Sequence, residues 1–180
     1  MNQYHNYIFL SEINDQLSVI IKKIKKVSII YYIDDFQLFN ENNCKLIRDF
    51  CKNINAPFYI VNSIKHVAKY KANGIYIKAN NKRIILKKYN KLKIIGSAHN
   101  TLDYFFKKNQ NCKMVMLSPL FYNKKYSNNK ILGTTKFRLI TQGWKTGVCA
   151  LGGINKTNIN KVKLIRTSNI GFRSMVYSIS

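Results

Sequence analysis

The segment GVCALGGINKTN, residues 147–158, has the pattern of a strand, a glycine turn and a helix. The apolar run Val148–Leu151 stops at Gly152 and Gly153. Asn155 or Thr157 can then cap a helix with apolar residues at helical spacing. Paired glycines let the backbone approach a ligand closely, and the positive end of a following helix favours an anion such as phosphate. The segment therefore predicts either a phosphate-binding turn or an ordinary strand-to-helix turn.

Strands and helices alternate in the same way along the rest of the chain. Continuous β-rich runs are typical of buried parallel strands, and the segments between them carry apolar residues at helical spacing. The expected strands are Tyr7–Leu10, Val27–Ile33, Phe58–Asn62, Ile75–Ile77, Lys93–Ser97, Lys113–Ser118, Val148–Leu151 and Asn169–Met175. Two expected helices are Ser63–Tyr70 and Thr134–Thr141. Four more helices are expected from apolar residues that fall on one helical face, and these faces are Leu17, Ile20, Ile21 and Ile24; Cys44, Ile47, Cys51 and Ile54; Leu102, Phe105 and Phe106; and Ile159, Val162 and Ile165.

This alternation predicts an α/β fold, a shortened (β/α)8 TIM barrel whose final helix is missing after Ser174. An open doubly wound sheet would give a similar pattern.

The composition indicates a single domain. At 180 residues and 46% hydrophobic, the chain is long enough for one substantial core, and no Pro/Gly/Ser-rich linker divides it, so we expect residues 1–180 to form one domain. No apolar run approaches a membrane span and no signal-like segment opens the sequence, which favours a cytoplasmic protein without a membrane partner. The four cysteines lack metal-type spacing, so we expect buried, reduced thiols.

The strongest compositional signal is charge, since 31 Lys and Arg against 7 Asp and Glu give a formal net charge of +24. Such a charge attracts nucleic acid or phosphorylated metabolites. Lysines nevertheless occur between nearly all apolar runs, as codon drift in an AT-rich genome would produce without a selected binding face. We therefore expect loose electrostatic attraction to nucleic acid but no specific nucleic-acid partner.

A barrel of this kind carries its functional residues in the loops that follow the strands, because these loops meet at one face. The candidates are the residues directly after the expected strands. They are Glu12, Asp34, Asp35, Asn62, Ser63, Asn80, Asn81, Ser97, His99, 118–125, Gly152, Gly153 and Ser174. Most of them can donate hydrogen bonds to phosphate, and few are acidic.

Residues Ile94–Leu132, followed by Cys149–Asn158, contain an ordered set of motifs. A strand ends in GSAH, the next ends in SPLF before a lysine-containing loop, and a later strand ends in GGI. In order and spacing this set resembles the thiamine phosphate synthase and thiazole tautomerase superfamily, which has G-x-S-x-H, G-P-x-F and G-G-I type motifs at these places. The resemblance covers about half of the chain, and it implies a (β/α)8 barrel.

The resemblance implies a transferase of thiamine biosynthesis that couples a hydroxymethylpyrimidine pyrophosphate to a thiazole phosphate and releases pyrophosphate, assisted by Mg²⁺. Its partners would be small phosphorylated heterocycles. By position, the resemblance assigns the thiazole phosphate to Gly152, Gly153 and Ser174, and the pyrophosphate to Ser97, Asn62 and Lys124 or Lys125.

The sequence departs from the family at the pyrophosphate and metal positions. Where the family's second strand ends in a Q-x-R-x-K type motif, this chain has Ile29–Ile33 without a cation. The family's Asn-Asp pair after the third strand is Asn62-Ser63, and the acid expected after the fourth strand is an asparagine. Asp34 and Asp35 follow the second strand closely enough to act as the Mg²⁺ ligands, or they form a turn or helix cap.

His99 and Pro119 bear on the branch of the superfamily. Histidine can exchange a proton near neutral pH, so His99 is a candidate general base, with a structural role as the alternative. The tautomerase branch has a histidine at the position of Pro119, and the chain is therefore closer to the synthase branch.

The prediction is thus a divergent thiamine phosphate synthase-like enzyme. A catalytically altered or inactive relative that still binds a phosphorylated thiazole or pyrimidine is the alternative. A basic nucleic-acid-binding protein, with Tyr31, Tyr32, Tyr122 and Tyr126 as stacking surfaces, is a further alternative. The barrel face left uncovered after Ser174 also predicts a homodimer contact.

Overall fold

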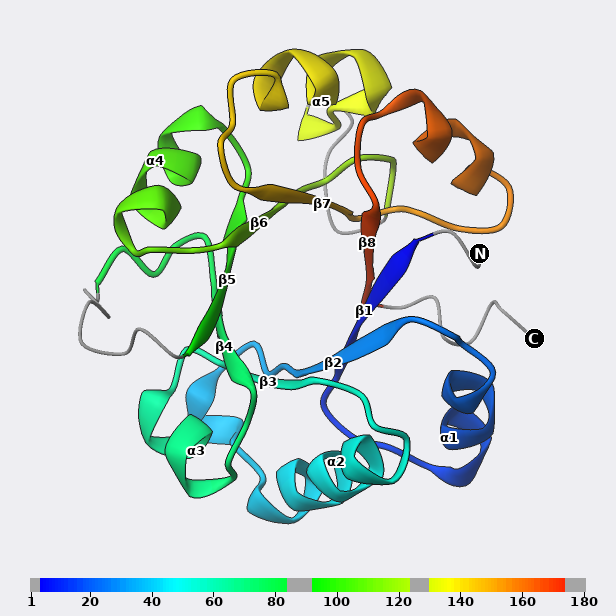
Figure 1. The fold of residues 1–180 in the computed structure, drawn as a ribbon, viewed down its shortest axis with the longest axis vertical. Coiled ribbons are helices and arrows are strands. Elements are labelled where there is room, and N and C mark those ends of the chain that lie inside the picture. Colours follow the sequence, from blue (N-terminus) through cyan, green and yellow to red (C-terminus); the bar gives the residue numbers. More distant parts are fainter. Residues whose placement is uncertain (1–3, 84–91, 124–129, 174–180) are drawn as a thin grey trace.

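Eight parallel strands close into a barrel in a computed structural model that describes residues 4–83, 92–123 and 130–173 (Figure 1). The strands are β1 (His5–Leu10), β2 (Val27–Tyr31), β3 (Phe58–Val61), β4 (Gly74–Ile77), β5 (Lys93–Ala98), β6 (Met114–Leu117), β7 (Gly147–Leu151) and β8 (Asn169–Phe172). The barrel is closed by pairing of β8 with β1, where His5 lies opposite Asn169. The predicted (β/α)8 barrel is confirmed, and the open sheet is excluded.

Helices follow the strands and form the outer layer of the barrel (Figure 1). They are α1 (Asp15–Lys22), η1 (Phe36–Leu38), α2 (Glu41–Asn53), α3 (Ile64–Lys69), α4 (Thr101–Asn109), α5 (Gly133–Thr141) and η3 (Ile159–Leu164), where η marks a 3-10 helix. A polar side chain caps the start of four α-helices by accepting a hydrogen bond from a backbone N–H two or three residues into the helix. These caps are Asn14, Asn40, Ser63 and Asn100.

The interior of the barrel is filled by aromatic side chains. Phe9 on β1 and Tyr76 on β4 come from strands that are not neighbours, and their rings meet edge to face with centroids 5.2 Å apart. The four cysteines are free and buried, as predicted. Because both faces of the strands are covered, the strands read as continuous apolar runs in the sequence.

The helix predicted after Gly153 is present only as the six-residue 3-10 helix η3, and the predicted cap at Asn155 or Thr157 is wrong. The side chain of Asn155 accepts hydrogen bonds from the backbone N–H groups of Thr157 and Asn158. The side chain of Asn158 in turn accepts from the backbone N–H of Asn155. These bonds favour a turn over a helix, and the helix begins only at Ile159. A helix this short offers no anion site at its N-terminus.

The inner face predicted for α4 is also wrong. Leu102 and Phe105 are 61% and 52% exposed, and the helix buries Tyr104 and Lys107 instead. Tyr104 stacks on Trp144 with centroids 4.1 Å apart, and Lys107 makes buried hydrogen bonds described below. Specific polar and aromatic contacts therefore override the apolar spacing.

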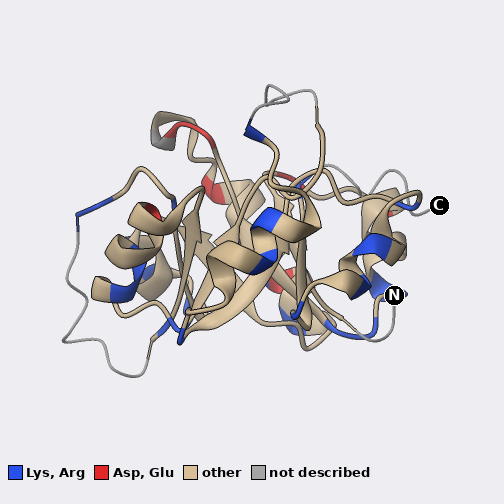
Figure 2. Ribbon diagram, turned by 90° about the horizontal axis from the view of Figure 1, so that it is seen from above, with Lys and Arg blue, Asp and Glu red and all other residues tan. Residues whose placement is uncertain are grey.

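Several predictions lie outside the described residues. They concern Lys124, Lys125, Ser174, Tyr126 and the missing final helix with its dimer contact. The eighth strand, predicted to reach Met175, ends at Phe172. Among the described helices, none has the length and apolar character needed to cross a membrane. Lysines and arginines lie on helices and loops around the barrel and are not confined to one side (Figure 2).

Candidate active site

A cavity of about 720 Å³, here called the mouth cavity, opens at the carboxyl ends of the strands. Its lining comes from the ends of every strand except β3 and from the segments that follow them. The lining residues are Phe9, Tyr32, Asp34, Tyr76, Lys78, Ala79, Asn80, Lys82, Ser97, His99, Asp103, Ser118, Leu151 and Arg173. Parallel barrels build their sites at this end, and the volume suits a small organic ligand.

Two cations that the sequence analysis did not select, Lys78 and Arg173, lie against one tyrosine ring in this cavity. Lys78 directly follows β4, and Arg173 directly follows β8. Lys78 Nζ is 4.7 Å and Arg173 Cζ is 4.1 Å from the ring centroid of Tyr32. The closed barrel thus brings together cations that are 95 residues apart in the sequence (173 minus 78), and the ring between them is a favourable cation–π partner.

Both cations are held by acceptors at the end of β2. Lys78 Nζ donates to the carbonyl oxygens of Ile33 at 2.7 Å and Asp34 at 2.6 Å. Arg173 Nη2 donates to both carboxylate oxygens of Asp34 at 2.7 Å. Burial acts to lower the pKa of Arg173, but the hydrogen bond and charge of Asp34 outweigh it and raise that pKa. The mouth cavity therefore has two positive charges in fixed positions.

A buried lysine supports the segment that carries Lys78. Lys107 on α4 has no exposed surface, and its Nζ donates to the carbonyl oxygens of Lys78 and Asn81, each at 2.7 Å, and to Gln110 Oε1 at 3.0 Å. Gln110 Nε2 donates to the carbonyl oxygens of Asn81 at 2.9 Å and Arg83 at 2.7 Å. Burial lowers the pKa of Lys107 to about 8. This polar cluster fixes the backbone that follows β4.

Ser97 and His99, both predicted site residues, line the mouth cavity. Burial raises the pKa of Tyr76, and its hydrogen bond with Ser97 acts in the opposite direction. His99 Nδ1 lies 2.9 Å from the carbonyl oxygen of Ser118. Because a carbonyl only accepts, Nδ1 carries a proton, and Nε2 is the acceptor in the neutral ring. His99 can therefore accept a proton at Nε2 while Ser118 orients the ring.

Gly152 and Gly153 lie at the carboxyl end of β7, but they are not among the residues that line the mouth cavity. Both have positive φ values, 91° and 73°. A Cβ added at Gly153 would meet the carbonyl oxygen of Phe121 and lie 2.5 Å from that of Tyr122. In this structure, the close approach that these glycines allow is to the backbone after β6, and phosphate binding by them stays a prediction.

Asn62 connects the ends of β3 and β4. Its φ is 50°, and its side-chain oxygen accepts from the backbone N–H of Lys78 at 3.0 Å. Together with Asp34, Asp35 and Lys78 it lines a smaller cavity of about 430 Å³ beside the mouth cavity. The structure thus places Asn62 where it positions Lys78, and its predicted contact with pyrophosphate stays a prediction.

The predicted magnesium ligands, Asp34 and Asp35, do not fit the ion as they are held. Both carboxylate oxygens of Asp34 accept from Arg173, and Asp35 Oδ1 accepts from the backbone N–H of Gln37 at 3.0 Å, as in a turn. Within the described residues, no three His, Cys, Asp or Glu side chains gather as a metal site. Magnesium prefers free carboxylate oxygens, so we derive no step through Mg²⁺.

The tyrosines proposed for nucleic-acid stacking have different environments. Tyr31 is fully buried and donates to the carbonyl oxygen of Asn40 at 3.0 Å, which excludes it from stacking. Tyr122 is 60% exposed, and the ring of Tyr32 is flanked by Lys78 and Arg173. No common stacking surface results from these described tyrosines.

Comparison with known proteins identifies relatives of the sequence. A family model described as thiamine monophosphate synthase matches residues 37–177. The chain is 30% identical over 120 residues to the thiamine-phosphate synthase of Prochlorococcus marinus subsp. pastoris, covering 65% of this chain and 34% of that protein. It is 29% identical over 122 residues to the enzyme of Prochlorococcus marinus strain AS9601, with the same coverage. The chain thus spans about a third of the length of these curated relatives.

Solved structures show the same fold. A thiamine phosphate pyrophosphorylase from Pyrococcus furiosus superimposes with a TM-score of 0.75 at 17% identity, covering 96% of this chain and 87% of that one. The N-(5'-phosphoribosyl)anthranilate isomerase of the same organism superimposes with a TM-score of 0.64 at 15% identity, covering 95% and 88%. At these identities the likeness establishes the barrel alone.

Proposed function

This chain belongs to the thiamine monophosphate synthase family, and we propose that it couples a hydroxymethylpyrimidine pyrophosphate to a thiazole phosphate in the mouth cavity. In this reaction the bond between the pyrimidine methyl carbon and the pyrophosphate oxygen breaks, and a bond from that carbon to the thiazole nitrogen forms. Pyrophosphate leaves with the bonding electron pair. The site must therefore stabilise negative charge on a departing oxygen.

The observation that carries the proposal is the pair of cations on Tyr32. The chain lacks the Q-x-R-x-K type motif after its second strand, but Lys78 and Arg173 bring positive charge to the end of that strand from β4 and β8. Their charges are fixed before a ligand binds, which favours stabilisation of charge that develops during the reaction. We assign the departing pyrophosphate to these two side chains.

The remaining lining of the cavity suits the two heterocycles. Phe9, Tyr32 and Tyr76 offer aromatic surface to a flat ring. Ser97 on β5 and Ser118 after β6 offer hydroxyl groups. His99 Nε2, as the acceptor of the neutral ring, can hold or take up a proton there. The lining thus offers both apolar and hydrogen-bonding surface to the substrates.

Turnover tests the proposal. The purified chain is incubated with both substrates in a buffer containing Mg²⁺ and 150 mM salt, roughly the physiological value, and scored for thiamine phosphate. We expect product from the wild type and at least about a hundredfold less from Lys78→Gln/Arg173→Gln. Lys22→Gln/Lys52→Gln removes two exposed charges from outer helices and should leave turnover unchanged. Equal activity of the two double variants would contradict the assignment.

A relative that binds without turnover is the second candidate, and one observation favours it. The glycines assigned to the thiazole phosphate contact the backbone of Phe121 and Tyr122 and do not line the mouth cavity. Saturable binding of the pyrimidine pyrophosphate by a folded protein that yields no product would support this candidate over the synthase.

A further inference from the structure

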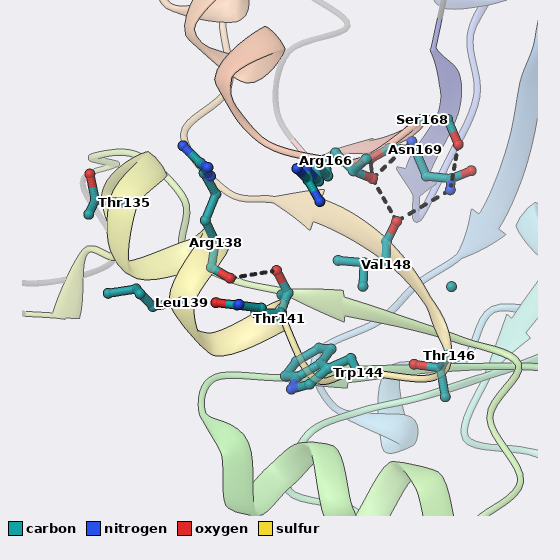
Figure 3. A pocket seen from close by; sticks show the side chains of 13 residues that line it. Thr135, Arg138, Leu139, Thr141, Trp144, Thr146, Val148, Arg166, Ser168 and Asn169 are labelled. Carbon is teal, nitrogen blue, oxygen red and sulfur yellow. Dashed lines mark hydrogen bonds between the residues drawn. The ribbon is translucent and has the colours of Figure 1, made fainter.

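A second cavity, here called the side cavity, lies between α5 and the segment 166–168 before β8, at the amino ends of β7 and β8 (Figure 3). Its volume is about 650 Å³. It shares no lining residue with the mouth cavity, which opens at the opposite ends of the strands. Cavities of this volume bind small organic molecules.

The charge of the side cavity is positive and uncompensated. Arg138 of α5 and Arg166, three residues before β8, approach it from its two walls. Neither guanidinium group has a hydrogen-bond or ion-pair partner within 4–83, 92–123 and 130–173. None of the thirteen lining residues is acidic, and the sequence contains no Asp or Glu after Asp103. An anion would therefore meet two arginines and no carboxylate.

The use of arginine at this place is informative in a chain so rich in lysine. Only five of the 31 basic residues are arginines, and two of the five line the side cavity. A guanidinium group binds carboxylate and phosphate with two parallel hydrogen bonds, which an ammonium group cannot do. Arg138 and Arg166 thus differ from the scattered lysines in the kind of anion contact that they can make.

The wall opposite the arginines is aromatic. Figure 3 shows Trp144 on the other side of the lining from Arg138 and Arg166. One face of the indole is covered by Tyr104, stacked at 4.1 Å and 7°. Trp144 thus offers an aromatic surface to a ligand in the side cavity.

We propose that the side cavity is a binding site for a small aromatic molecule that carries a phosphate or carboxylate group. The anionic group binds between Arg138 and Arg166, and the ring lies along Trp144. The site is independent of the proposed synthase reaction, because its residues take no part in the mouth cavity.

Intrinsic fluorescence tests this proposal directly, because Trp144 is the single tryptophan of the chain. The full chain is titrated with phenyl phosphate, and with phenol as the neutral probe, in 150 mM salt, roughly physiological. We expect saturable quenching by phenyl phosphate and at least about tenfold weaker binding of phenol. Comparable affinity for phenol would overturn the anion site.

Two double variants separate a defined site from general electrostatics. Arg138→Gln/Arg166→Gln should weaken phenyl phosphate binding by about tenfold or more. Lys161→Gln/Lys163→Gln removes the same charge from exposed positions on the neighbouring η3 and should change it by less than about twofold. Equal weakening of phenyl phosphate binding by both double variants would overturn the proposal. Quenching by a short oligothymidylate without quenching by phenyl phosphate would also overturn it.

Discussion

The mouth cavity and the side cavity each contain two principal cations, but these cations are held differently. In the mouth cavity Arg173 is paired with Asp34, and Lys78 donates to two carbonyl oxygens. In the side cavity Arg138 and Arg166 have no such acceptors among the described residues. A ligand of the mouth cavity meets charges already in position, whereas a ligand of the side cavity must order them itself.

This difference suits the two cavities to different tasks. Stabilising a leaving group during a reaction requires dipoles and charges that do not need to reorganise, and the mouth cavity has them. Binding without chemistry tolerates a loss of side-chain freedom, at the expense of affinity. This difference supports the proposals of catalysis in the mouth cavity and of binding in the side cavity.

The largest expected effect concerns the close backbone packing of Gly153, at the carboxyl end of β7. Gly153→Ala places a Cβ against the carbonyl oxygens of Phe121 and Tyr122 at a φ of 73°, and we expect a loss of about 4 kcal/mol in the free energy of unfolding. Gly143→Ala, between two residues that line the side cavity, meets no atom within 4 Å and should change stability by less than about 1 kcal/mol. Urea unfolding measures the free energy of unfolding of both variants. Similar losses in the two variants would contradict the contrast between the tightly packed Gly153 and the open Gly143.

A smaller loss is expected at the support beneath Lys78. Lys107→Met removes the ammonium group that donates to the carbonyl oxygens of Lys78 and Asn81, and it should lower the free energy of unfolding by about 2 kcal/mol at pH 7. Lys108→Met, at the exposed neighbouring position, is the matched control and should have little effect. A loss of the same size in both variants would argue against a supporting role for Lys107.

The difference in stability between the wild type and Lys107→Met should depend on pH, in a direction set by the pKa of Lys107. Burial lowers the pKa of Lys107 from 10.5 to about 8, so across that interval the unfolded chain binds more protons than the folded one. Stability contributed by this group therefore rises with pH from about 8 to 10. The melting temperature of the wild type should rise relative to that of Lys107→Met between about pH 8 and pH 10. A constant difference between the two melting temperatures would contradict the lowered pKa.

A still smaller effect is expected when the charge at the mouth is kept but its geometry is lost. Arg173→Lys preserves the positive charge but removes the planar guanidinium group whose Nη2 donates to both carboxylate oxygens of Asp34. We expect KM for the pyrimidine pyrophosphate to rise about fivefold in steady-state kinetics, with the free energy of unfolding unchanged within about 0.5 kcal/mol. An unchanged KM would mean that the exact position of the positive charge at residue 173 matters less than its presence.

The smallest effect is expected at the acceptor itself. The Asp34 side chain is 66% exposed, so Asp34→Asn should alter the free energy of unfolding by less than about 0.5 kcal/mol. Removing its negative charge should tighten pyrophosphate binding by about twofold, measured with Mg²⁺ present. Binding weakened tenfold or more only when Mg²⁺ is present would instead identify Asp34 as a metal ligand.

Most of the barrel could be predicted from the sequence because parallel strands buried on both faces leave continuous apolar runs, as at Val27–Tyr31. The short η3 could not, since Asn155 and Asn158 form a local turn that competes with the expected helix. Apolar spacing also predicted the wrong buried face for α4, where the buried Lys107 donates hydrogen bonds to carbonyl oxygens after the end of β4. Local patterns identify elements better than they identify long-range polar contacts.

The site was predicted in part for the same reason. Ser97, His99 and Asp34 reach the mouth cavity because they end or follow strands. Lys78 was missed because one lysine among so many carries no contrast, and Arg173 because the last strand was extended past it. The signal available was position, since both residues directly follow a strand. Their meeting at Asp34 depends on barrel closure, which no local pattern contains.

A calorimetric titration of pyrophosphate measures whether Lys78 and Arg173 bind the leaving group. It compares the wild type with Lys78→Gln/Arg173→Gln and with the control Lys22→Gln/Lys52→Gln, at 150 mM salt, roughly physiological. We expect one saturable site in the wild type and the control, and affinity reduced about thirtyfold or more in Lys78→Gln/Arg173→Gln. Equal affinity in all three proteins would contradict the assignment of the leaving group to Lys78 and Arg173.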